Sequence, residues 1–287
     1  MSRRIDSRRA SPSPVDLASA SPQRMPIPAE RQARVIEIVR RENVASIHTI
    51  ACALGASPST VRRDLDELAE KGYLERTHGG AVFRSHQHPT FEPSREIAEH
   101  MSLPAKTAIG RAAAELVENG QSVIFDSSST VLEAARRVAE RAPRITAVTN
   151  DLGIAQVLSR AEDIHLIVSG GSLRARSLTL MGEPGIALIG SLTVDIAFIG
   201  IHSLADLKPS ETSLEVVAMK QALIRAARQV VLLVDSSKFD SPAFCTVCPI
   251  ERFHHLITDD RIPDATKRAC EERGIVVTVV RSEAGAA

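Results

Sequence analysis

Two hydrophobic patterns follow one another along the 287-residue chain. Up to about Arg84, apolar residues recur at three- and four-residue spacing, which is typical of amphipathic helices. From about Phe91 onward, short apolar runs rich in β-branched residues alternate with further helical patterns, which predicts βαβ units and a mostly parallel sheet. The runs predicted as strands are Ser122–Phe125, Ile145–Thr149, Ile164–Val168, Val194–Ile199, Val230–Val234 and Ile275–Val279.

Composition divides the chain into three parts. Residues 1–24 combine Ser, Arg, Pro and Ala with few large apolar side chains, so we expect a disordered basic tail. Residues 25–84 carry the first helical pattern and end before the polar, Pro-containing stretch Ser85–Pro89, which we interpret as a linker. Residues 85–287 then form the second domain, for which we expect a Rossmann-like α/β fold.

The first domain has the spacing of a helix-turn-helix. A helix beginning near Ala29 is predicted to end at Asn43. A second helix begins at the N-cap Ser46 and ends at Gly55, which suits a left-handed C-terminal cap. The third helix begins at Ser57, followed by Pro in its first turn, only a few residues after the second ends.

The third helix presents hydroxyl and cationic side chains in its first two turns, whereas its later outward positions are acidic. Such a helix suits the major groove, where Arg bonds guanine and Ser or Thr contacts bases or phosphate. Two strands joined near Gly79-Gly80 form a wing that suits contacts with the phosphate backbone or minor groove. The candidate DNA-binding residues are Ser57, Ser59, Thr60, Arg62, Arg63, Arg76 and His78. The alternative is an ordinary solvated face of a three-helix cap.

One run in this domain resembles a known family signature. The run Ser57-Pro58-Ser59-Thr60-Val61-Arg62-Arg63-Asp64-Leu65, followed by Leu68, Gly72 and His78-Gly79-Gly80-Ala81, is similar to the winged helix-turn-helix of the DeoR family of bacterial transcriptional regulators. The resemblance implies that the first domain binds double-stranded operator DNA.

Polar residues follow three predicted strands of the second domain. Asp126, Ser127, Ser128, Ser129 and Thr130 follow the first strand and open a helix, where free N–H groups and the helix dipole favour an anion. Because carboxyl ends of parallel strands share one edge, we expect this loop to converge with those of the next two strands on an anionic polyol. The other candidate effector-binding residues are Thr149, Asn150, Gly170, Gly171, Arg174, Lys220 and Lys238. The alternatives are N-capping by the serines and solvated surface positions for the two lysines.

The resemblance to the DeoR family continues through this domain. The residues that match the family here are Val148-Thr149-Asn150, Gly170-Gly171, Leu173-Arg174, Gly182, Glu215, Lys220 and Asp235-Ser236-Ser237-Lys238-Phe239. The family's effector domain is similar in fold to ribose-5-phosphate isomerase and usually senses a phosphorylated sugar, and the positions matching Asp126 to Thr130 and Lys220 are associated with its pocket. This chain departs from the family at Ser128, at Ile201-His202-Ser203 and at Val216, where the family often has Gly, an Asp-Gly pair and a second acid.

Charge and composition narrow the partners. Residues 1–84 hold 14 Lys and Arg against 10 Asp and Glu, so they carry a net charge of +4, and the rest of the chain carries −4. Only the first part is therefore suited to a polyanion. Aromatic residues make up 3% of the chain and Trp is absent, which argues against stacking platforms for single-stranded nucleic acid and leaves duplex DNA.

Other chemistry has little support in the sequence. The four cysteines are too scattered for a disulfide framework, and no apolar run approaches the roughly 20 residues that cross a bilayer, so we expect a cytoplasmic protein with no membrane contact. Cys245 and Cys248 are three apart on an extended segment, so their side chains point to opposite faces and do not predict a zinc site. We expect no metal, no cofactor and no catalytic residue.

These patterns together predict a DNA-binding transcriptional regulator. We expect a homo-oligomer, a dimer or tetramer, that represses a carbohydrate or polyol catabolic operon until a phosphorylated metabolite binds residues 85–287. The rival interpretation is a sugar-phosphate isomerase or transferase-like enzyme with an appended helical domain, in which Asp126, Glu215 or Lys220 moves protons. A third is a scaffold that binds protein through residues 28–84.

Overall fold

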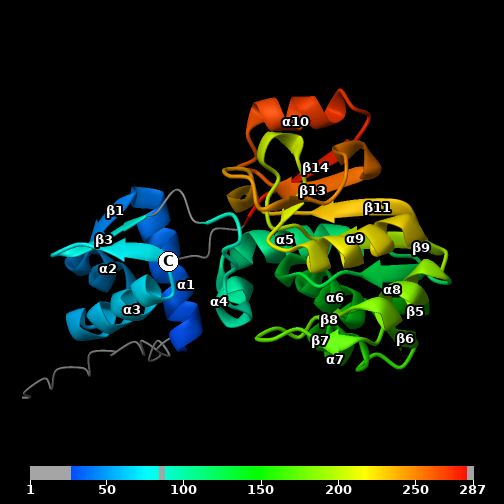
Figure 1. The fold of residues 1–287 in the computed structure, drawn as a ribbon, viewed down its shortest axis with the longest axis horizontal. Coiled ribbons are helices and arrows are strands. Elements are labelled where there is room, and N and C mark those ends of the chain that lie inside the picture. The colour runs from blue at the N-terminus through cyan, green and yellow to red at the C-terminus, as the bar shows by residue number, and fades with distance from the viewer. Residues whose placement is uncertain (1–26, 84–87, 283–287) are drawn as a thin grey trace, which may run out of the picture.

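The computed structural model describes residues 27–83 and 88–282. Figure 1 shows a small N-terminal domain beside a larger domain in which helices cover both faces of a sheet. The expected tail at residues 1–24 lies outside the described residues, as does most of the expected linker at 85–89. Among the helices of the described ranges, none combines the length and the apolar character that crossing a membrane requires.

Residues 27–83 fold into three helices and a small antiparallel sheet. The helices are α1 (Pro28–Glu42), α2 (Ile47–Leu54) and α3 (Pro58–Glu70). The strands are β1 (Val44–Ser46), β2 (Leu74–Arg76) and β3 (Gly80–Phe83), in the order β1-β3-β2. The predicted wing is therefore confirmed, and β1 adds a third strand that its three-residue length hid from the pattern.

The predicted helix boundaries are confirmed by the caps. Asn43 follows α1 with a positive φ of 59°, and Gly55 ends α2 in the left-handed region. The hydroxyl of Ser46 accepts a hydrogen bond from Thr49 N, and that of Ser57 accepts one from Thr60 N. These side chains satisfy N–H groups that a helix start leaves free, so the close succession of α2 and α3 is encoded locally.

One buried ion pair fixes α3 against α1. Asp64 is 2% exposed and accepts hydrogen bonds from Arg31 Nε at 2.6 Å and from Arg31 Nη2 at 2.9 Å. The pair lies beside the apolar contacts of Val61, Leu65 and Leu68 with the rest of this domain's core. The helix that carries the candidate DNA-binding residues is thus held by both apolar burial and a two-point charged contact.

Gly80 is required where the wing passes β1. Gly80 pairs with Ser46, and a methyl group on its Cα would overlap the carbonyl oxygen of Ala45. Gly79 has no heavy atom within 4 Å of the corresponding position. We expect Gly80→Ala to lower the free energy of unfolding of this domain by about 2 kcal/mol or more, because backbone cannot move aside as a flexible side chain can.

Gly79→Ala is the matched control, since both substitutions restrict the unfolded chain equally. Urea denaturation followed by the emission of Tyr73, which lies in this domain's core, measures the difference. Equal midpoints for the two variants would contradict the expected overlap.

The larger domain is built on a seven-stranded parallel sheet with the order β14-β13-β11-β9-β4-β5-β6. Its strands are β4 (Ser122–Phe125), β5 (Ile145–Thr149), β6 (Ile164–Val168), β9 (Val194–Ile199), β11 (Ala227–Leu233), β13 (His255–Asp259) and β14 (Val276–Val280). Its helices are α4 (Arg95–His100), α5 (Leu103–Ala114), α6 (Ser129–Arg141), α7 (Leu152–Leu158), α8 (Glu183–Gly190), α9 (Leu214–Ala226) and α10 (Asp264–Glu271). Two short antiparallel pairs flank the sheet, β7 (Ser172–Leu173) with β8 (Leu180–Met181) and β10 (Ser210–Glu211) with β12 (Cys245–Thr246). Single helical turns occupy Ala205–Leu207, Ser236–Lys238 and Ile250–Arg252.

Alternate residues along the strands pack into two separate hydrophobic cores, one on each face of the sheet. On β4, Val123 and Phe125 pack with α5, α6 and α7, whereas Ile124 packs with the core formed by α8, α9 and α10. Both faces of the sheet are therefore buried, which is why its strands are continuously apolar. The predicted α/β fold with a mostly parallel sheet is confirmed.

The strand order reverses between β4 and β9. From β4 the chain proceeds to β5 and β6 on one side, and from β9 it proceeds to β11, β13 and β14 on the other. The carboxyl ends of two strands that lead in opposite directions leave a crevice, which is the usual ligand position in open α/β sheets. Asp126 and Gly200, which follow β4 and β9, lie at this point.

Candidate functional site

The beginning of α3 presents exposed hydroxyl and guanidinium groups. Ser57 Oγ lies 2.8 Å from Ser59 Oγ and 2.9 Å from Thr60 Oγ1. Arg62 and Arg63 are exposed and make no ion pair with any other described residue. A helix N-terminus with free cations beside it suits the phosphates and base edges of a duplex.

The two candidate DNA-binding residues of the wing, Arg76 and His78, differ in how free their side chains are to contact DNA. Arg76 is half-buried and donates to Asp66 Oδ1 at 2.8 Å and to the carbonyl of Gly80 at 2.7 Å. Its guanidinium thus ties the wing to α3, whereas His78 is exposed in the turn between β2 and β3. A DNA contact by Arg76 requires that it share or leave Asp66, and its assignment, like that of His78, stays a prediction.

In the larger domain, the loops after β4, β5 and β6 converge as the sequence predicted. Ser127 N donates to Asn150 Oδ1 at 3.2 Å, and Ser127 Oγ donates to Asp151 Oδ2 at 2.8 Å. Ser169 N donates to the carbonyl of Thr149 at 2.9 Å. These bonds join three segments far apart in the sequence at one edge of the sheet.

Several of the predicted effector residues make close contacts within these loops and strands. Thr149 Oγ1 donates to the carbonyl of Phe125 at 2.7 Å and is fully buried. Gly171 has a φ of 114° and approaches the carbonyl of Met181 so closely that no Cβ fits. Asn150 and Thr130 are also buried. Contact of these residues with an effector stays a prediction.

A buried lysine joins the crevice between β4 and β9. Lys220 is 3% exposed, and its ammonium donates to Asp126 Oδ2 and to the carbonyl of Gly200, with Glu211 Oε1 at 3.4 Å. The alternative interpretation of Lys220 as a solvated surface charge is therefore wrong. Its three N–H donors each face an oxygen, which is how a buried ammonium is tolerated.

Two carboxylates share this single ammonium. Burial and the negative charge of Asp126 raise the pKa of Glu211, although Lys220 acts against them. Burial tends to lower the pKa of Lys220, but Asp126 and Glu211 outweigh it and raise that pKa. The lysine therefore stays charged and holds the loops after β4 and β9 together with β10.

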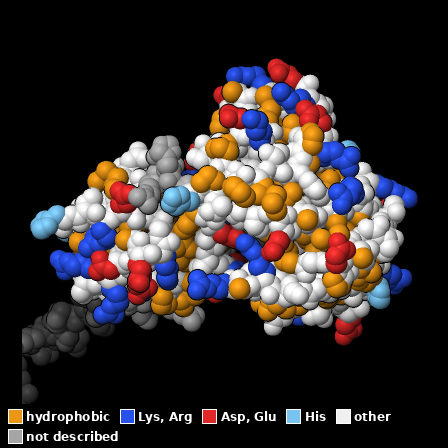
Figure 2. Space-filling view, viewed as in Figure 1, with side chains coloured by type: hydrophobic (Ala, Val, Ile, Leu, Met, Phe, Trp, Pro, Cys, Tyr) orange, Lys and Arg blue, Asp and Glu red, His pale blue; other side chains and the backbone are white. Residues whose placement is uncertain are grey.

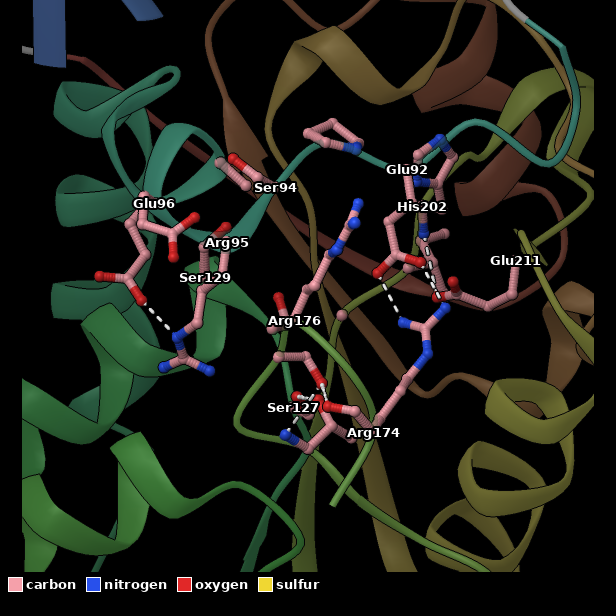
Figure 3. A pocket seen from close by; sticks show the side chains of 18 of the residues that line it. Glu92, Ser94, Arg95, Glu96, Ser127, Ser129, Arg174, Arg176, His202 and Glu211 are labelled. Atoms are coloured by element: carbon pink, nitrogen blue, oxygen red, sulfur yellow. Dashed lines mark hydrogen bonds and ion pairs between the residues drawn. The ribbon is translucent and has the colours of Figure 1, made fainter. Parts of the chain in front are cut away.

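Two arginines of the β7–β8 hairpin, Arg174 and Arg176, lie near the carboxyl edge of the sheet (Figure 3). Arg174 Nη1 and Nη2 donate to the two carboxylate oxygens of Glu92 at 2.7 and 2.6 Å, and Thr212 Oγ1 donates to Glu92 Oε2 at 3.1 Å. Arg176 is exposed, has a φ of 58°, and makes no ion pair within the described ranges. The left-handed backbone of a non-glycine residue is strained by about 1 kcal/mol or more, and such strain is often found at binding sites.

A cavity of about 750 Å³ opens between these groups and the N-terminal domain. Figure 2 shows acidic and basic side chains gathered in the hollow between the domains. The predicted residues that line it are Ser127, Ser128, Ser129, Arg174, Lys220 and Lys238. The N-terminal domain contributes Lys71 and Tyr73, and the segment that follows it contributes residues from Glu92 to Glu96 together with Ala98 and Glu99.

The residues that sequence reasoning missed here come from chain segments with no strand-end signal. Among them are Lys71, Tyr73, Glu92, Arg95 and Glu211. His202, which departs from the family pattern, also lines the cavity. Burial and the charge of Lys238 lower the pKa of His202 to about 4, so a neutral imidazole faces the cavity at neutral pH.

Cys245 and Cys248, the two cysteines considered for a zinc site, do not line this cavity. Cys245 is buried and Cys248 is half-buried. Burial raises the pKa of Cys248 to about 11, which keeps its thiol protonated. In the part of the chain that the structure describes, no cluster of His, Cys, Asp and Glu is arranged to hold a metal ion.

Comparisons with known proteins cover both domains. Ribose 5-phosphate isomerase A from Methanocaldococcus jannaschii is similar over 47% of this chain and 53% of that chain, at 19% identity and a TM-score of 0.35. The regulator GlpR of Haloferax volcanii is 33% identical over 88% of this chain and 97% of that protein. The glycerol-3-phosphate regulon repressor of Escherichia coli (strain K12) is 32% identical over 80% of this chain and 90% of that protein. The DeoR-like helix-turn-helix domain matches residues 31–87 and the DeoR C terminal sensor domain matches residues 102–260, so the chain belongs to the DeoR family of helix-turn-helix transcriptional regulators.

Proposed function

We propose that this regulator represses a carbohydrate or polyol catabolic operon and is released when a phosphorylated metabolite enters the cavity between its domains. The observation that carries the proposal is that one cavity is lined both by Arg174, Arg176 and Lys238 and by Lys71 and Tyr73 of the N-terminal domain. Guanidinium and ammonium groups beside a helix N-terminus suit a phosphate, and serine hydroxyls suit a polyol. A ligand bound there contacts the domain that binds DNA.

Release follows from linkage between the two sites. A ligand that favours one arrangement of the domains weakens operator binding by its difference in affinity for the two arrangements, typically about 1 to 3 kcal/mol. The domains contact each other through groups that such a ligand can disturb. Arg40 on α1 donates to the carbonyl of Ser237 at 2.8 Å and pairs with Asp240, on the segment that carries Lys238.

The experiment begins with the DNA. Genomic fragments retained by the purified full chain identify the operator and its neighbouring genes, and a panel of phosphorylated sugars is then added to the complex. Release by one of them, and by neither the unphosphorylated sugar nor inorganic phosphate at the same concentration, supports the proposal. Retention of the operator across a panel chosen from the neighbouring pathway contradicts it.

We expect Arg63→Ala to weaken operator binding about 5- to 150-fold, which corresponds to about 1 to 3 kcal/mol. If Arg63 bonds a base, the loss is confined to the operator and specificity relaxes, and if it contacts phosphate, all sequences weaken alike. Fluorescence anisotropy with operator and random duplexes measures both. Arg160→Ala, at an exposed site just after α7 in the larger domain, is the control. Unchanged operator affinity in Arg63→Ala contradicts either role.

We further propose that the protein acts in the cytoplasm as a homo-oligomer that binds its ligand without converting it. Two copies place two α3 helices on paired half-sites, which multiplies a modest affinity. Lys220 is enclosed by Asp126, Gly200 and Glu211 and offers no free proton donor to the cavity. Sedimentation of the purified protein tests whether it forms a homo-oligomer. NMR of sugar phosphates incubated with the protein tests whether it converts them, and any turnover contradicts the proposal.

A further inference from the structure

In the cavity, the carboxylate of Glu92 is already paired with Arg174, the cation best suited to bind an anionic ligand. Glu92 meets Arg174 with both oxygens, in the fork geometry with which arginine binds carboxylates and phosphates (Figure 3). Burial tends to raise the pKa of Glu92, but the hydrogen bonds and charge of Arg174 outweigh it and hold that pKa below its ordinary value. Glu92 is therefore an anion at neutral pH.

The Glu92–Arg174 ion pair lies where an incoming anion can replace Glu92. The Glu92 side chain is 39% exposed and that of Arg174 is 25% exposed, whereas the Lys220 and Asp126 side chains are 3% and 2% exposed. A pair at the solvent-accessible wall of a cavity opens far more readily than one sealed in the core. Arg176 lies beside it within the same cavity and has no anion of its own among the described residues. An incoming anion thus finds the guanidinium of Arg176 free and that of Arg174 bound to Glu92.

Glu92 also lies on the segment that joins the two domains. On one side of it, Phe91 packs edge-on against Tyr73, with ring centres 5.1 Å apart. On the other, Ser94 N donates to the Tyr73 hydroxyl at 2.7 Å. Two contacts with the N-terminal domain therefore flank Glu92, which pairs with Arg174 of the β7–β8 hairpin.

We propose that Glu92 is an internal ligand of Arg174, which the anionic group of the effector displaces, and that this displacement releases the segment holding Tyr73. The inference rests on the proposed function, because it takes the cavity to be an anion site. It adds the step by which binding reaches the N-terminal domain. An internal competitor lowers the apparent affinity for the effector by the fraction of molecules in which Arg174 is vacant.

The experiment titrates inorganic phosphate, the simplest anion of this class, into the full chain. Tyr73 is the only Tyr and the chain has no Trp, so intrinsic emission reports the contacts with Phe91 and Ser94. Isothermal titration calorimetry measures phosphate binding itself in each variant, and we expect Glu92→Gln to lower the phosphate concentration at half-saturation about tenfold relative to the unmodified chain. Without phosphate, its emission should already resemble that of the phosphate-saturated unmodified chain.

Two further variants separate the possible results. Glu162→Gln removes the same charge at an exposed position before β6, on the opposite edge of the sheet, and should leave the titration unchanged. Arg174→Met should abolish phosphate binding. If Arg174→Met loses binding but Glu92→Gln binds phosphate no better than the unmodified chain, the role of Glu92 is overturned and the anion site stands. If no variant binds phosphate in a way that depends on Arg174, both are overturned.

Discussion

Lys220→Met should lower the free energy of unfolding of the larger domain by about 3 to 5 kcal/mol, as expected when one partner of a buried ion pair is removed. Methionine fills a similar volume, but it leaves Asp126 and Glu211 facing each other without a cation. The carbonyl of Gly200 also loses its donor. Thermal unfolding followed by circular dichroism at about pH 8 gives the loss.

The deficit should shrink as the pH falls. In the variant, burial and mutual repulsion favour the protonated forms of Asp126 and Glu211, so their pKa values in the folded state lie above those in the unfolded chain. Groups whose pKa is raised by folding contribute stability at low pH that is lost as the pH rises through the folded value. The difference between the unmodified chain and Lys220→Met should therefore be smaller at about pH 5 than at about pH 8.

Two variants make this test specific. Lys208→Met removes an exposed lysine from the same domain and should change stability by no more than about 0.5 kcal/mol. Adding Glu211→Gln to Lys220→Met removes one of the two facing charges and should recover part of the loss. A deficit that is independent of pH and of Glu211 would show that Lys220 acts through packing alone.

The sheet was predictable because a parallel strand buried on both faces is a continuous apolar run. The predicted strands at β4, β5, β6 and β9 have the bounds that the structure shows, and those at β11 and β14 are shifted by one to three residues. The strand β13 was missed because His255, Thr258 and Asp259 interrupt its apolar character. All three are buried, and Asp259 accepts hydrogen bonds from Ser236, a contact that no local pattern records.

The candidate site was predictable only where strand ends define it. The convergence of the loops at Ser127, Asn150 and Ser169 follows from parallel topology. Glu92 and Tyr73 carry no such signal, because the packing of one domain against the other brings them to the cavity. The burial of Lys220 was equally invisible, since a lysine on an amphipathic helix is usually solvated and its two acidic partners lie on other elements.

One further buried charge could have been recognised from helical periodicity. Asp64 lies three residues after Val61 and four before Leu68, so it shares their face of α3 rather than the acidic outward surface. A carboxylate at such a position requires a cation from a neighbouring element, which Arg31 of α1 supplies. The acidic residue next to Arg62 and Arg63 is thus structural, and the helix tip keeps its positive charge for a polyanion.

Asp64→Ala should therefore lower the free energy of unfolding of the N-terminal domain by about 3 to 5 kcal/mol, because the Arg31 side chain, 12% exposed, loses the carboxylate that accepts two of its hydrogen bonds. Asp66→Ala is the matched control two residues later on α3. Asp66 is 65% exposed and pairs with Arg76, a surface contact worth about 0 to 1 kcal/mol. Urea denaturation followed by Tyr73 emission compares the two.

A double substitution shows whether the lost stability comes from the charge of Arg31 that Asp64 no longer compensates. Arg31→Met combined with Asp64→Leu replaces the pair by apolar side chains and should recover most of what Asp64→Ala loses, since an apolar pair in a well-packed site is often as stable as a buried ion pair. If the double variant is as unstable as Asp64→Ala, the hydrogen-bonded geometry itself, rather than the compensation of charge, holds α3 against α1. In either case the pair lies on the buried face of α3, away from the exposed side chains of Arg62 and Arg63.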